Sequence, residues 1–211
     1  MTYRLLTTAA LLASLCAPAI GAEMKAIPRD CGDGSSRCFM ILFWGKIEKG
    51  DDLKFKKLVA DNNIRDGAAT VSLNSNGGHA LAGFGIGRTI AENKFWTFVD
   101  GKSVCASACA DVWLAGAERW VEAGARIGFH STGITLKQGR REWTVPSNAG
   151  NALTGAYYKE LRLSDKAIMM LVTAPPNQML WLTTKIANDL QIDFSFWQPQ
   201  TRASARKEDA R

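Results

Sequence analysis

The sequence predicts one α/β domain in which short apolar strands alternate with helices and pair mainly in parallel. The chain has 211 residues and 46% hydrophobic content, which suits a single domain with a full core. A helical pattern follows a strand pattern twice, after Ala69–Leu73 and again after Phe95–Val99. Strands that alternate with helices in this way are typical of α/β domains.

The first 22 residues have the pattern of a secretory signal peptide. Residues 1–22 carry one charged side chain, Arg4, followed by the mainly apolar run Leu5–Ala17 and then by small residues. The apolar run is too short to cross a bilayer. We expect cleavage after Ala22 or Ala19.

The C-terminal segment 199–211 is polar and is predicted to be disordered, so we expect the folded domain to span residues 24–198. The formal net charge of +6 is not gathered into a basic patch interleaved with aromatic residues, which argues against nucleic-acid binding. No segment after the leader is apolar and long enough to span a membrane. The mature chain is therefore expected to be soluble and either secreted or periplasmic.

The first elements follow from apolar spacing. Phe39–Trp44 is a short apolar run that predicts a buried strand. Asp51–Asp61 has apolar residues at helical spacing behind an aspartate cap, so it predicts a helix. Ala69–Leu73 predicts the next strand, and Ala80–Glu92 a helix whose small residues permit close packing.

The middle of the chain continues the alternation. Phe95–Val99 predicts a strand and Ser107–Leu114 a helix. Glu118–Val121 and Ala125–Phe129 predict a strand-turn-strand passage. The polar stretch Ser131–Val145 is expected to form a projecting loop or hairpin.

The last part of the chain is mainly helical. Ala149–Leu163, Asp165–Val172 and Leu182–Leu190 predict helices, with a break at two consecutive prolines, and Ile192–Phe196 predicts a short strand. The seven tryptophans are scattered through mostly apolar segments, which favours core packing for them.

Four cysteines remain after the leader: Cys31, Cys38, Cys105 and Cys109. An even number in an exported protein favours disulfides, with three connectivities open. A Cys31–Cys38 bridge would close a short loop. A Cys105–Cys109 bridge requires Cys105 to lie before the helix, because cysteines four apart within a regular helix are poorly oriented for bonding. With two histidines and no CxxC pair the spacing does not suit zinc, and we expect no metal or other cofactor.

Three motifs between Val71 and Thr132 fit one catalytic site. A strand ends in Asn-Gly-Gly, Ser107 stands where a helix begins, and a second strand ends in His130. A serine nucleophile needs a base to accept its proton and N–H donors to hold the oxyanion. The N-terminus of a helix and a glycine turn can both supply such donors. The pattern predicts a serine-type hydrolase.

These motifs resemble the proteolytic subunit of the Clp protease. The corresponding pieces are NSNGG at Asn74–Gly78, ASA at Ala106–Ala108 and ARIGFH at Ala125–His130. Their order and approximate spacing match over about residues 41–192, and the chain is identified as similar to an exported branch of the crotonase/ClpP-fold superfamily. The resemblance implies a crotonase/Clp-protease-like fold of repeated strand-strand-helix units.

The resemblance also implies roles for individual residues. Ser107 would be the nucleophile and His130 the general base. The oxyanion hole would be formed by the N–H of Ala108 and an N–H of the turn at Gly77 and Gly78, with Gly78 favoured.

The third triad member departs from the family pattern. The family's aspartate lies a few residues ahead of a segment whose counterpart here is 181–183, and residues 177–180 contain no carboxylate. Asn177 could orient the imidazole, as asparagine does in some cysteine proteases, or Asp165 could reach it. A Ser–His dyad and an inactive site remain as alternatives.

Other chemistries are less favoured. Cys105 and Cys109 flank the serine, but in an oxidising compartment these thiols are better explained as paired or buried. A serine–lysine dyad would need Lys137 or Lys159, neither of which falls in a recognisable motif. His79 is expected to be a polar contact at the edge of the site.

The sequence therefore predicts an ATP-independent serine-type peptidase or related acyl hydrolase that acts on peptide or protein substrates outside the cytoplasm. A catalytically silent Clp-like domain used for binding or assembly is the alternative. The missing aspartate favours the silent domain, and the retained serine, histidine and glycine turn favour the enzyme. Self-association of identical chains is left open.

Overall fold

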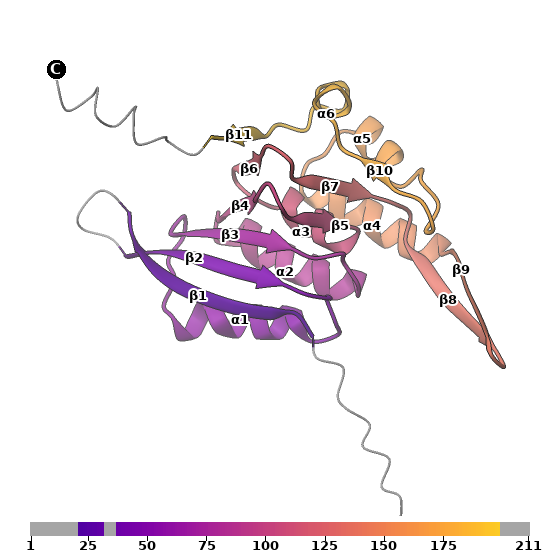
Figure 1. The fold of residues 1–211 in the computed structure, drawn as a ribbon, viewed down its shortest axis with the longest axis horizontal. Coiled ribbons are helices and arrows are strands. Elements are labelled where there is room, and N and C mark those ends of the chain that lie inside the picture. The colour runs from indigo at the N-terminus through magenta and orange to yellow at the C-terminus, as the bar shows by residue number, and fades with distance from the viewer. Residues whose placement is uncertain (1–20, 32–36, 199–211) are drawn as a thin grey trace, which may run out of the picture.

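A six-stranded sheet with the strand order β1-β2-β3-β4-β6-β11 lies at the centre of the structure, a computed structural model that describes residues 21–31 and 37–198 (Figure 1). All its neighbouring strands pair in parallel except β1, which is antiparallel to β2. Its strands are β1 Glu23–Asp30, β2 Arg37–Trp44, β3 Ala69–Asn74, β4 Trp96–Val99, β6 Arg119–Glu122 and β11 Ser195–Trp197.

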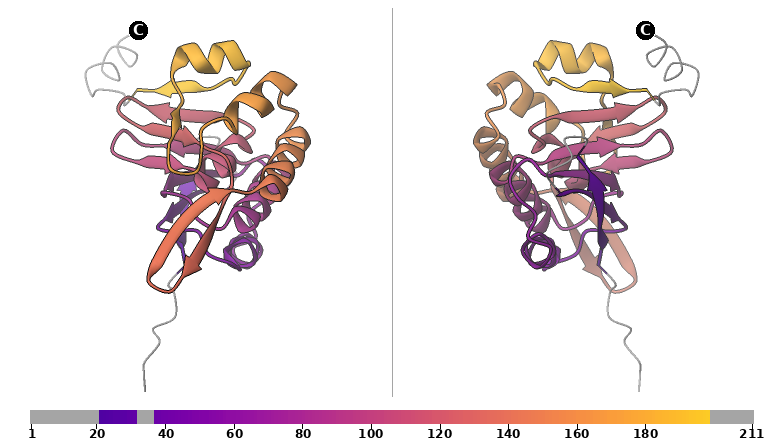
Figure 2. Two further views of the ribbon diagram at one scale, coloured as in Figure 1. Left: turned by 90° about the vertical axis from the view of Figure 1, so that its right-hand side faces the viewer. Right: turned by 90° about the vertical axis from the view of Figure 1, so that its left-hand side faces the viewer.

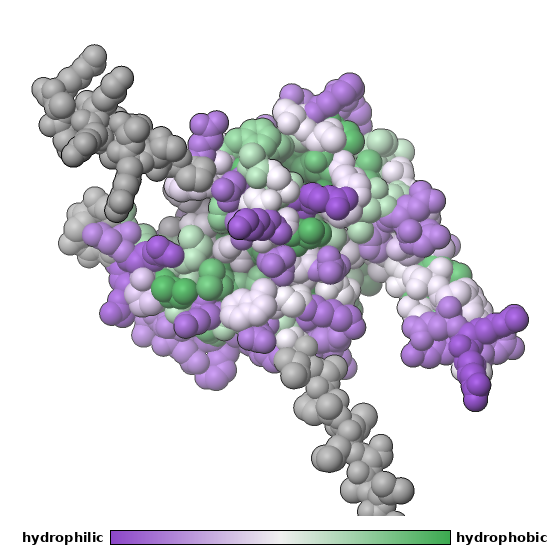
Figure 3. All heavy atoms as spheres, viewed as in Figure 1, coloured by the Kyte–Doolittle hydropathy of each residue, from purple (hydrophilic) through white to green (hydrophobic). Residues whose placement is uncertain are grey.

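A second, three-stranded sheet has the order β10-β7-β5, and two further strands form a hairpin that projects from the body (Figure 1). The three strands are β5 Val104–Ala106, β7 Arg126–Phe129 and β10 Leu180–Trp181. The hairpin consists of β8 Gly133–Gln138 and β9 Arg141–Pro146, as the polar sequence led us to expect. Its far end is hydrophilic (Figure 3).

The helices gather on one side of the six-stranded sheet (Figure 2). They are α1 Asp51–Asp61, α2 Ala80–Glu92, α3 Ala108–Leu114, α4 Asn148–Glu160, α5 Asp165–Leu171 and α6 Thr184–Leu190. Trp113 of α3 is fully buried among them, and the rings of Phe84 and Tyr157 stack with their centroids 4.6 Å apart. Gly87 lets α2 approach α4, because a β-carbon there would collide with the hydroxyl of Tyr157.

The opposite face of the sheet carries exposed aromatic side chains, so the expectation that the tryptophans pack in the core is wrong for several of them. Trp44, Trp96 and Trp197 of this sheet are exposed by more than a third, as is Trp143 of the projecting hairpin, whereas Trp113 is fully buried. A shallow hollow of about 310 Å³ on this face is lined by Met40, Thr70, Trp96, Phe98, Trp120 and Trp197. Side chains of alternate residues on a strand point to opposite faces, and only one face is covered by helices.

The predicted α/β class is confirmed, and most predicted elements agree with the structure to within a few residues. Three strands were not predicted: β1, β5 and β10. The helix that was expected from Ser107 begins at Ala108, because Ser107 itself has a non-helical backbone. The last strand lies at Ser195–Trp197, later than expected.

Both cysteine pairs named from the sequence are disulfides. Cys31 joins Cys38, and Cys105 joins Cys109 with their Cα atoms 5.1 Å apart. Cys105 lies in β5 and Cys109 in α3, so the second bridge meets the requirement that one cysteine precede the helix. Most of the predicted signal peptide and the polar C-terminal tail lie outside the described residues.

The start of β1 is held to α1 by a buried carboxylate. Asp51 is fully buried, and its Oδ2 accepts hydrogen bonds from the backbone N–H groups of Ala22 and Glu48, each at 2.8 Å. Its Oδ1 accepts a hydrogen bond from the ammonium of Lys54 at 2.7 Å. One side chain therefore satisfies three donors from separate parts of the chain.

We expect Asp51→Ala to lower the free energy of unfolding by roughly 2–4 kcal/mol, because two backbone N–H groups lose a charged acceptor. Asp61→Ala, on the same helix, should change it by less than about 0.5 kcal/mol, because Asp61 is exposed and pairs only with Lys57. Urea unfolding of both variants measures the difference. Equal effects would contradict the assigned role of Asp51.

Candidate active site

Ser107 and His130 follow two neighbouring parallel strands. In the small sheet, β5 pairs with β7 in a register that sets Ala106 opposite Gly128. Ser107 directly follows β5, and His130 directly follows β7. Because the carboxyl ends of adjacent parallel strands lie at the same edge of a sheet, the pairing brings serine and histidine to one place.

The backbone of Ser107 adopts an unusual conformation, with φ 56° and ψ −130°. Its N–H donates to the carbonyl of Gly128 at 2.8 Å, and its carbonyl accepts from the N–H of Asp111 at 3.2 Å. A non-glycine residue with positive φ is strained, and such residues concentrate at functional sites. The sharp turn from β5 into α3 places the half-buried serine immediately before the start of the helix.

The Asn-Gly-Gly turn is hydrogen-bonded to the strand that carries the serine. The N–H of Ser75 donates to the carbonyl of Val104 at 2.8 Å, and the N–H of Ala106 donates to the carbonyl of Ser75 at 3.0 Å. A β-carbon at Gly77 would lie 2.7 Å from Cβ of Ser107. Only glycine fits there, and its φ of 90° is also one that glycine adopts readily.

Two N–H groups next to the serine are free to hold an oxyanion. The N–H of Gly77 is not one of them, since it donates to Oγ of Ser75 at 3.0 Å. In the described part of the chain no acceptor is found for the N–H of Gly78 or of Ala108. Of the turn and helix residues expected to form the oxyanion hole, Gly78 and Ala108 keep an available donor.

These groups meet at a cavity of about 460 Å³. It is lined by Gly78, His79, Ala80, Leu81, Ser107, Ala108, Asp111, His130, Thr132, Gly133, Ile134, Thr144 and Pro176. The base of the β8–β9 hairpin thus forms one wall, opposite the start of α2. The structure brings together the predicted nucleophile, base and oxyanion donors.

The imidazole of His130 is oriented by a backbone group. Its Nδ1 lies 2.7 Å from the carbonyl oxygen of Ser131. A carbonyl can only accept, so Nδ1 carries the proton and Nε2 of the neutral ring has a free lone pair. No hydrogen bond joins the ring to Oγ of Ser107 in the described structure. Catalytic hydrogen bonds often tighten only when substrate binds.

The other residues considered for the triad or a dyad lie elsewhere. Asn177 is exposed and does not line the cavity, and among the described contacts it makes no hydrogen bond to the imidazole. Asp165 is exposed and accepts a hydrogen bond from Lys159 at 2.8 Å. Lys137 pairs with Glu142 on the exposed hairpin. Within residues 21–31 and 37–198, no lysine and no carboxylate is therefore hydrogen-bonded to Ser107 or His130.

His79 lies at the rim and caps α2, because its Nδ1 accepts a hydrogen bond from the N–H of Ala82 at 3.2 Å. This agrees with the expectation of a polar contact at the edge of the site. The described residues contain no group of three or more histidine, cysteine or acidic side chains placed to hold a metal ion.

Asp111 is a cavity residue that the sequence interpretation missed. It lies in α3 four residues after the serine and is only 7% exposed. Burial raises the pKa of its carboxyl to about 7, against a smaller opposing effect of the hydrogen bond from Tyr158, whose hydroxyl lies 2.6 Å from Oδ1. Burial also raises the pKa of Tyr158, so that hydroxyl remains a donor. The available signal was an aspartate within the otherwise apolar helix segment ACADVWL.

Solved structures show the same architecture. A serine-to-alanine variant of the 1510-N membrane-bound stomatin-specific protease aligns with a TM-score of 0.56 and 17% identity, over 80% of this chain and 81% of that one. A lysine-to-alanine variant of that protease in complex with a substrate peptide gives 0.56 and 19%, over 76% and 74%. ClpP1 from Listeria monocytogenes gives 0.54 and 18%, over 76% and 92%.

The chain therefore has a Clp-protease-like fold, the fold of known serine peptidases. At these identities the likeness establishes the fold. No protein-family model and no curated protein sequence matches the chain.

The raised pKa of Asp111 should make stability fall as pH rises. Between the ordinary value of 3.8 and about 7 the folded protein holds a proton that the unfolded chain has lost. The free energy of unfolding should fall across this range by up to about 4 kcal/mol from this group and level off above it. Urea unfolding of Asp111→Asn should show a smaller loss between pH 5 and pH 8, whereas Asp61→Asn should behave as wild type. An unchanged pH dependence in Asp111→Asn would refute this assignment.

Proposed function

We propose that the protein is an ATP-independent serine peptidase or related acyl hydrolase that acts on peptides outside the cytoplasm. One observation carries the proposal: Ser107, His130 and the free N–H groups of Gly78 and Ala108 all border one cavity. The strained backbone of the serine supports it, since such strain is typical of a nucleophile held at a sharp strand-to-helix turn.

In the first step Oγ of Ser107 attacks the substrate carbonyl while Nε2 of His130 accepts its proton. The carbonyl oxygen becomes an oxyanion held by the N–H groups of Gly78 and Ala108. When the tetrahedral intermediate collapses, the imidazolium returns the proton to the leaving amine or alcohol, and the serine remains acylated. Water then attacks the ester with the same histidine as base, which releases the acid and restores the serine.

The imidazole works in this scheme without a carboxylate partner. The carbonyl of Ser131 selects the tautomer that has its lone pair on Nε2. Ser131 is fixed in turn, because its own N–H donates to the carbonyl of Ala174 at 2.7 Å. A neutral acceptor stabilises the imidazolium less than a carboxylate does, so we expect a modest turnover rate. Asn177 has no part in this scheme.

Export is supported by the leader pattern and by the two disulfides, which persist in oxidising compartments. Among the described residues, none of the helices has the length and apolar character that a membrane span requires. Outside the cytoplasm the protein is separated from ATP-driven unfoldases, so the proposed proteolysis needs no ATP. A fold neighbour solved with a substrate peptide supports peptides as the substrate class. Sedimentation would measure whether identical chains self-associate.

Ser107→Ala and His130→Ala should each lower kcat by several orders of magnitude, and combining them should add little, because the two residues act as one unit. Asn177→Ala is the matched control at an exposed position and should retain activity within about twofold. The measurement is hydrolysis of a fluorogenic peptide together with covalent labelling by a fluorophosphonate. Labelling should be lost in Ser107→Ala and kept in Asn177→Ala.

The silent-domain alternative gives a different result. It predicts that the wild-type protein neither reacts with the fluorophosphonate nor turns over any peptide. Full activity in Ser107→Ala would also overturn the catalytic assignment.

The two cleavage positions expected for the leader differ in one contact. Cleavage after Ala22 would remove the N–H that donates to buried Asp51, whereas cleavage after Ala19 would keep it. Ala22 is itself buried. We therefore expect N-terminal sequencing of the exported protein to begin at residue 20. A mature chain that begins at Glu23 would contradict this expectation.

A further inference from the structure

Among the described residues, the cavity at Ser107 is lined by one acidic side chain and by no lysine or arginine. The acidic residue is Asp111. The other titratable groups at its wall are His79 and His130, which already bond to a backbone N–H and a backbone carbonyl through Nδ1.

The protein provides a hydrogen-bond donor to one of the two carboxylate oxygens of Asp111. Oδ1 accepts the hydroxyl of Tyr158 at 2.6 Å, and no hydrogen bond in the described part of the chain reaches Oδ2. The described side-chain atoms that are enclosed without a partner are Nε1 of Trp113 and Oγ of Ser131. Oδ2 of Asp111 is not one of them, so this oxygen keeps some accessible surface, and the residue lines the cavity.

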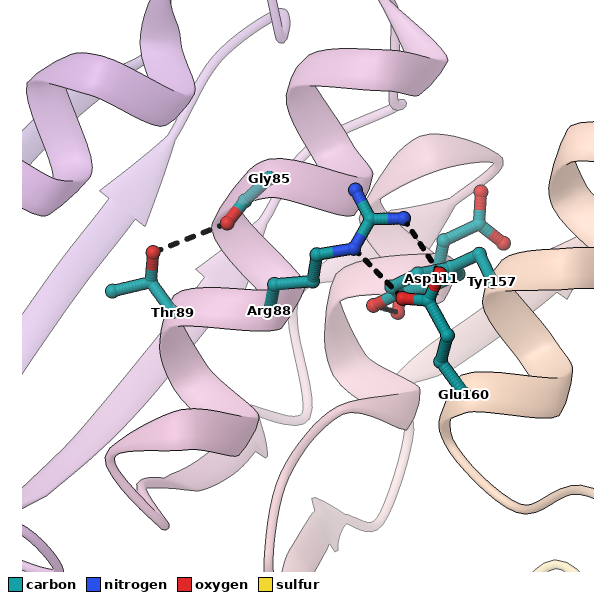
Figure 4. A network of polar contacts seen from close by, with 6 residues as sticks. All are labelled: Gly85, Arg88, Thr89, Asp111, Tyr157 and Glu160. Carbon is teal, nitrogen blue, oxygen red and sulfur yellow. Dashed lines mark hydrogen bonds and ion pairs between the residues drawn. The ribbon is translucent and has the colours of Figure 1, made fainter.

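The arginine in this region, Arg88, already forms an ion pair. Arg88 of α2 makes two hydrogen bonds to Glu160 of α4, at 2.7 and 3.0 Å. Tyr157 donates to the backbone carbonyl of Asp111 at 3.0 Å and does not bind its carboxylate. Figure 4 shows the Asp111 carboxylate apart from the Arg88–Glu160 pair. Two neutral tyrosines of α4 thus contact Asp111, and the arginine nearby on α2 is paired with Glu160.

Asp111 is also close to the reacting atoms. Ser107 directly precedes α3 and Asp111 lies in the first turn of that helix, where its N–H donates to the carbonyl of Ser107 at 3.2 Å. Both residues line the same cavity. Helical side chains lean toward the N-terminus of their helix. Asp111 therefore borders the same cavity as the oxyanion donors Gly78 and Ala108, and its negative charge disfavours a second negative charge there unless a cation neutralises it.

We propose that Asp111 determines substrate specificity by binding the cationic side chain, lysine or arginine, of the peptide residue whose carbonyl Ser107 attacks. This inference rests on the proposed peptidase function. A substrate cation gives Oδ2 its missing partner and offsets the cost of a buried unpaired charge. It also cancels the charge that opposes the oxyanion. Lysine suits the site because its flexible methylene chain can pack along the cavity wall while its ammonium reaches the carboxylate.

The test compares fluorogenic peptides that differ only at the residue before the scissile bond, which is lysine, norleucine or glutamate. At pH 8 the lysine peptide should exceed the norleucine peptide in kcat/KM by roughly 10- to 100-fold, the size of a hydrogen bond to a charged group. The ratio should shrink toward pH 6, because the Asp111 carboxyl takes up a proton near pH 7. Lysine stays charged throughout, and the two histidines affect both peptides alike, so the ratio isolates the carboxylate.

Asp111→Asn should bring the lysine-to-norleucine ratio close to one, and Asp61→Asn should leave it unchanged. The asparagine oxygen can still accept from Tyr158, so the variant removes the charge and keeps the shape. Equal kcat/KM for the two peptides in the wild type, or a preference that survives Asp111→Asn, would overturn the proposal. The pH comparison in the wild type needs no variant.

A binding measurement separates this proposal from the peptidase assignment. Calorimetric titration of Ser107→Ala with the uncleaved lysine and norleucine peptides should show roughly 10-fold or greater tighter binding of lysine at pH 8. If no form of the protein turns over peptide yet lysine is still preferred, the peptidase assignment fails and the cation site stands. If turnover occurs without any preference, the cation site fails alone.

Discussion

The site depends on the backbone pairing of one three-residue strand, β5. On one side β5 bonds to Ser75 of the glycine turn, and on the other it pairs in parallel with β7, which precedes His130. Three segments far apart in the sequence are therefore fixed at the distances that backbone hydrogen bonds impose. A one-residue slip of β5 against β7 would move Ser107 away from the histidine. The Cys105–Cys109 bridge spans the same turn and helps to hold it.

This constraint has a cost that the rest of the fold offsets. Ser107 is held with positive φ, and the glycine turn is pressed so closely against it that a β-carbon at Gly77 would collide. Asp111 is buried with one oxygen unpaired by the protein. Packing of α3 against α2, full burial of Trp113 and Tyr157, and the hydrogen bonds of Tyr157 and Tyr158 to Asp111 support these unfavourable features. Local features that destabilise a fold are typical of functional sites.

The orientation of the histidine shows how a site of this kind can be arranged without the usual carboxylate. The imidazole takes its tautomer from the carbonyl of Ser131, a group that every residue carries. The sequence could not reveal this partner of the histidine in place of the usual acidic triad residue. Every residue has a backbone carbonyl, so the identity of the side chain does not indicate which carbonyl accepts the hydrogen bond. The single carboxylate in the cavity, Asp111, contacts Tyr158 and serves a different purpose in our proposal.

The sequence was sufficient to predict the α/β class, the bounds of α1 and α2 and the convergence of Ser107, His130 and Gly78, because each has a local pattern: apolar periodicity or a short motif. The four cysteines left three disulfide connectivities open, and the structure decided between them. The remaining features depend on tertiary contacts. β5 has three residues and β10 has two, and both are stabilised by pairing with neighbouring strands. Such short segments show no apolar periodicity from which a strand could be predicted. The exposure of the tryptophans depended on which face of the sheet the helices cover, and the partner of His130 and the burial of Asp111 depended on contacts between residues distant in the chain. Such contacts exist only once the chain has folded.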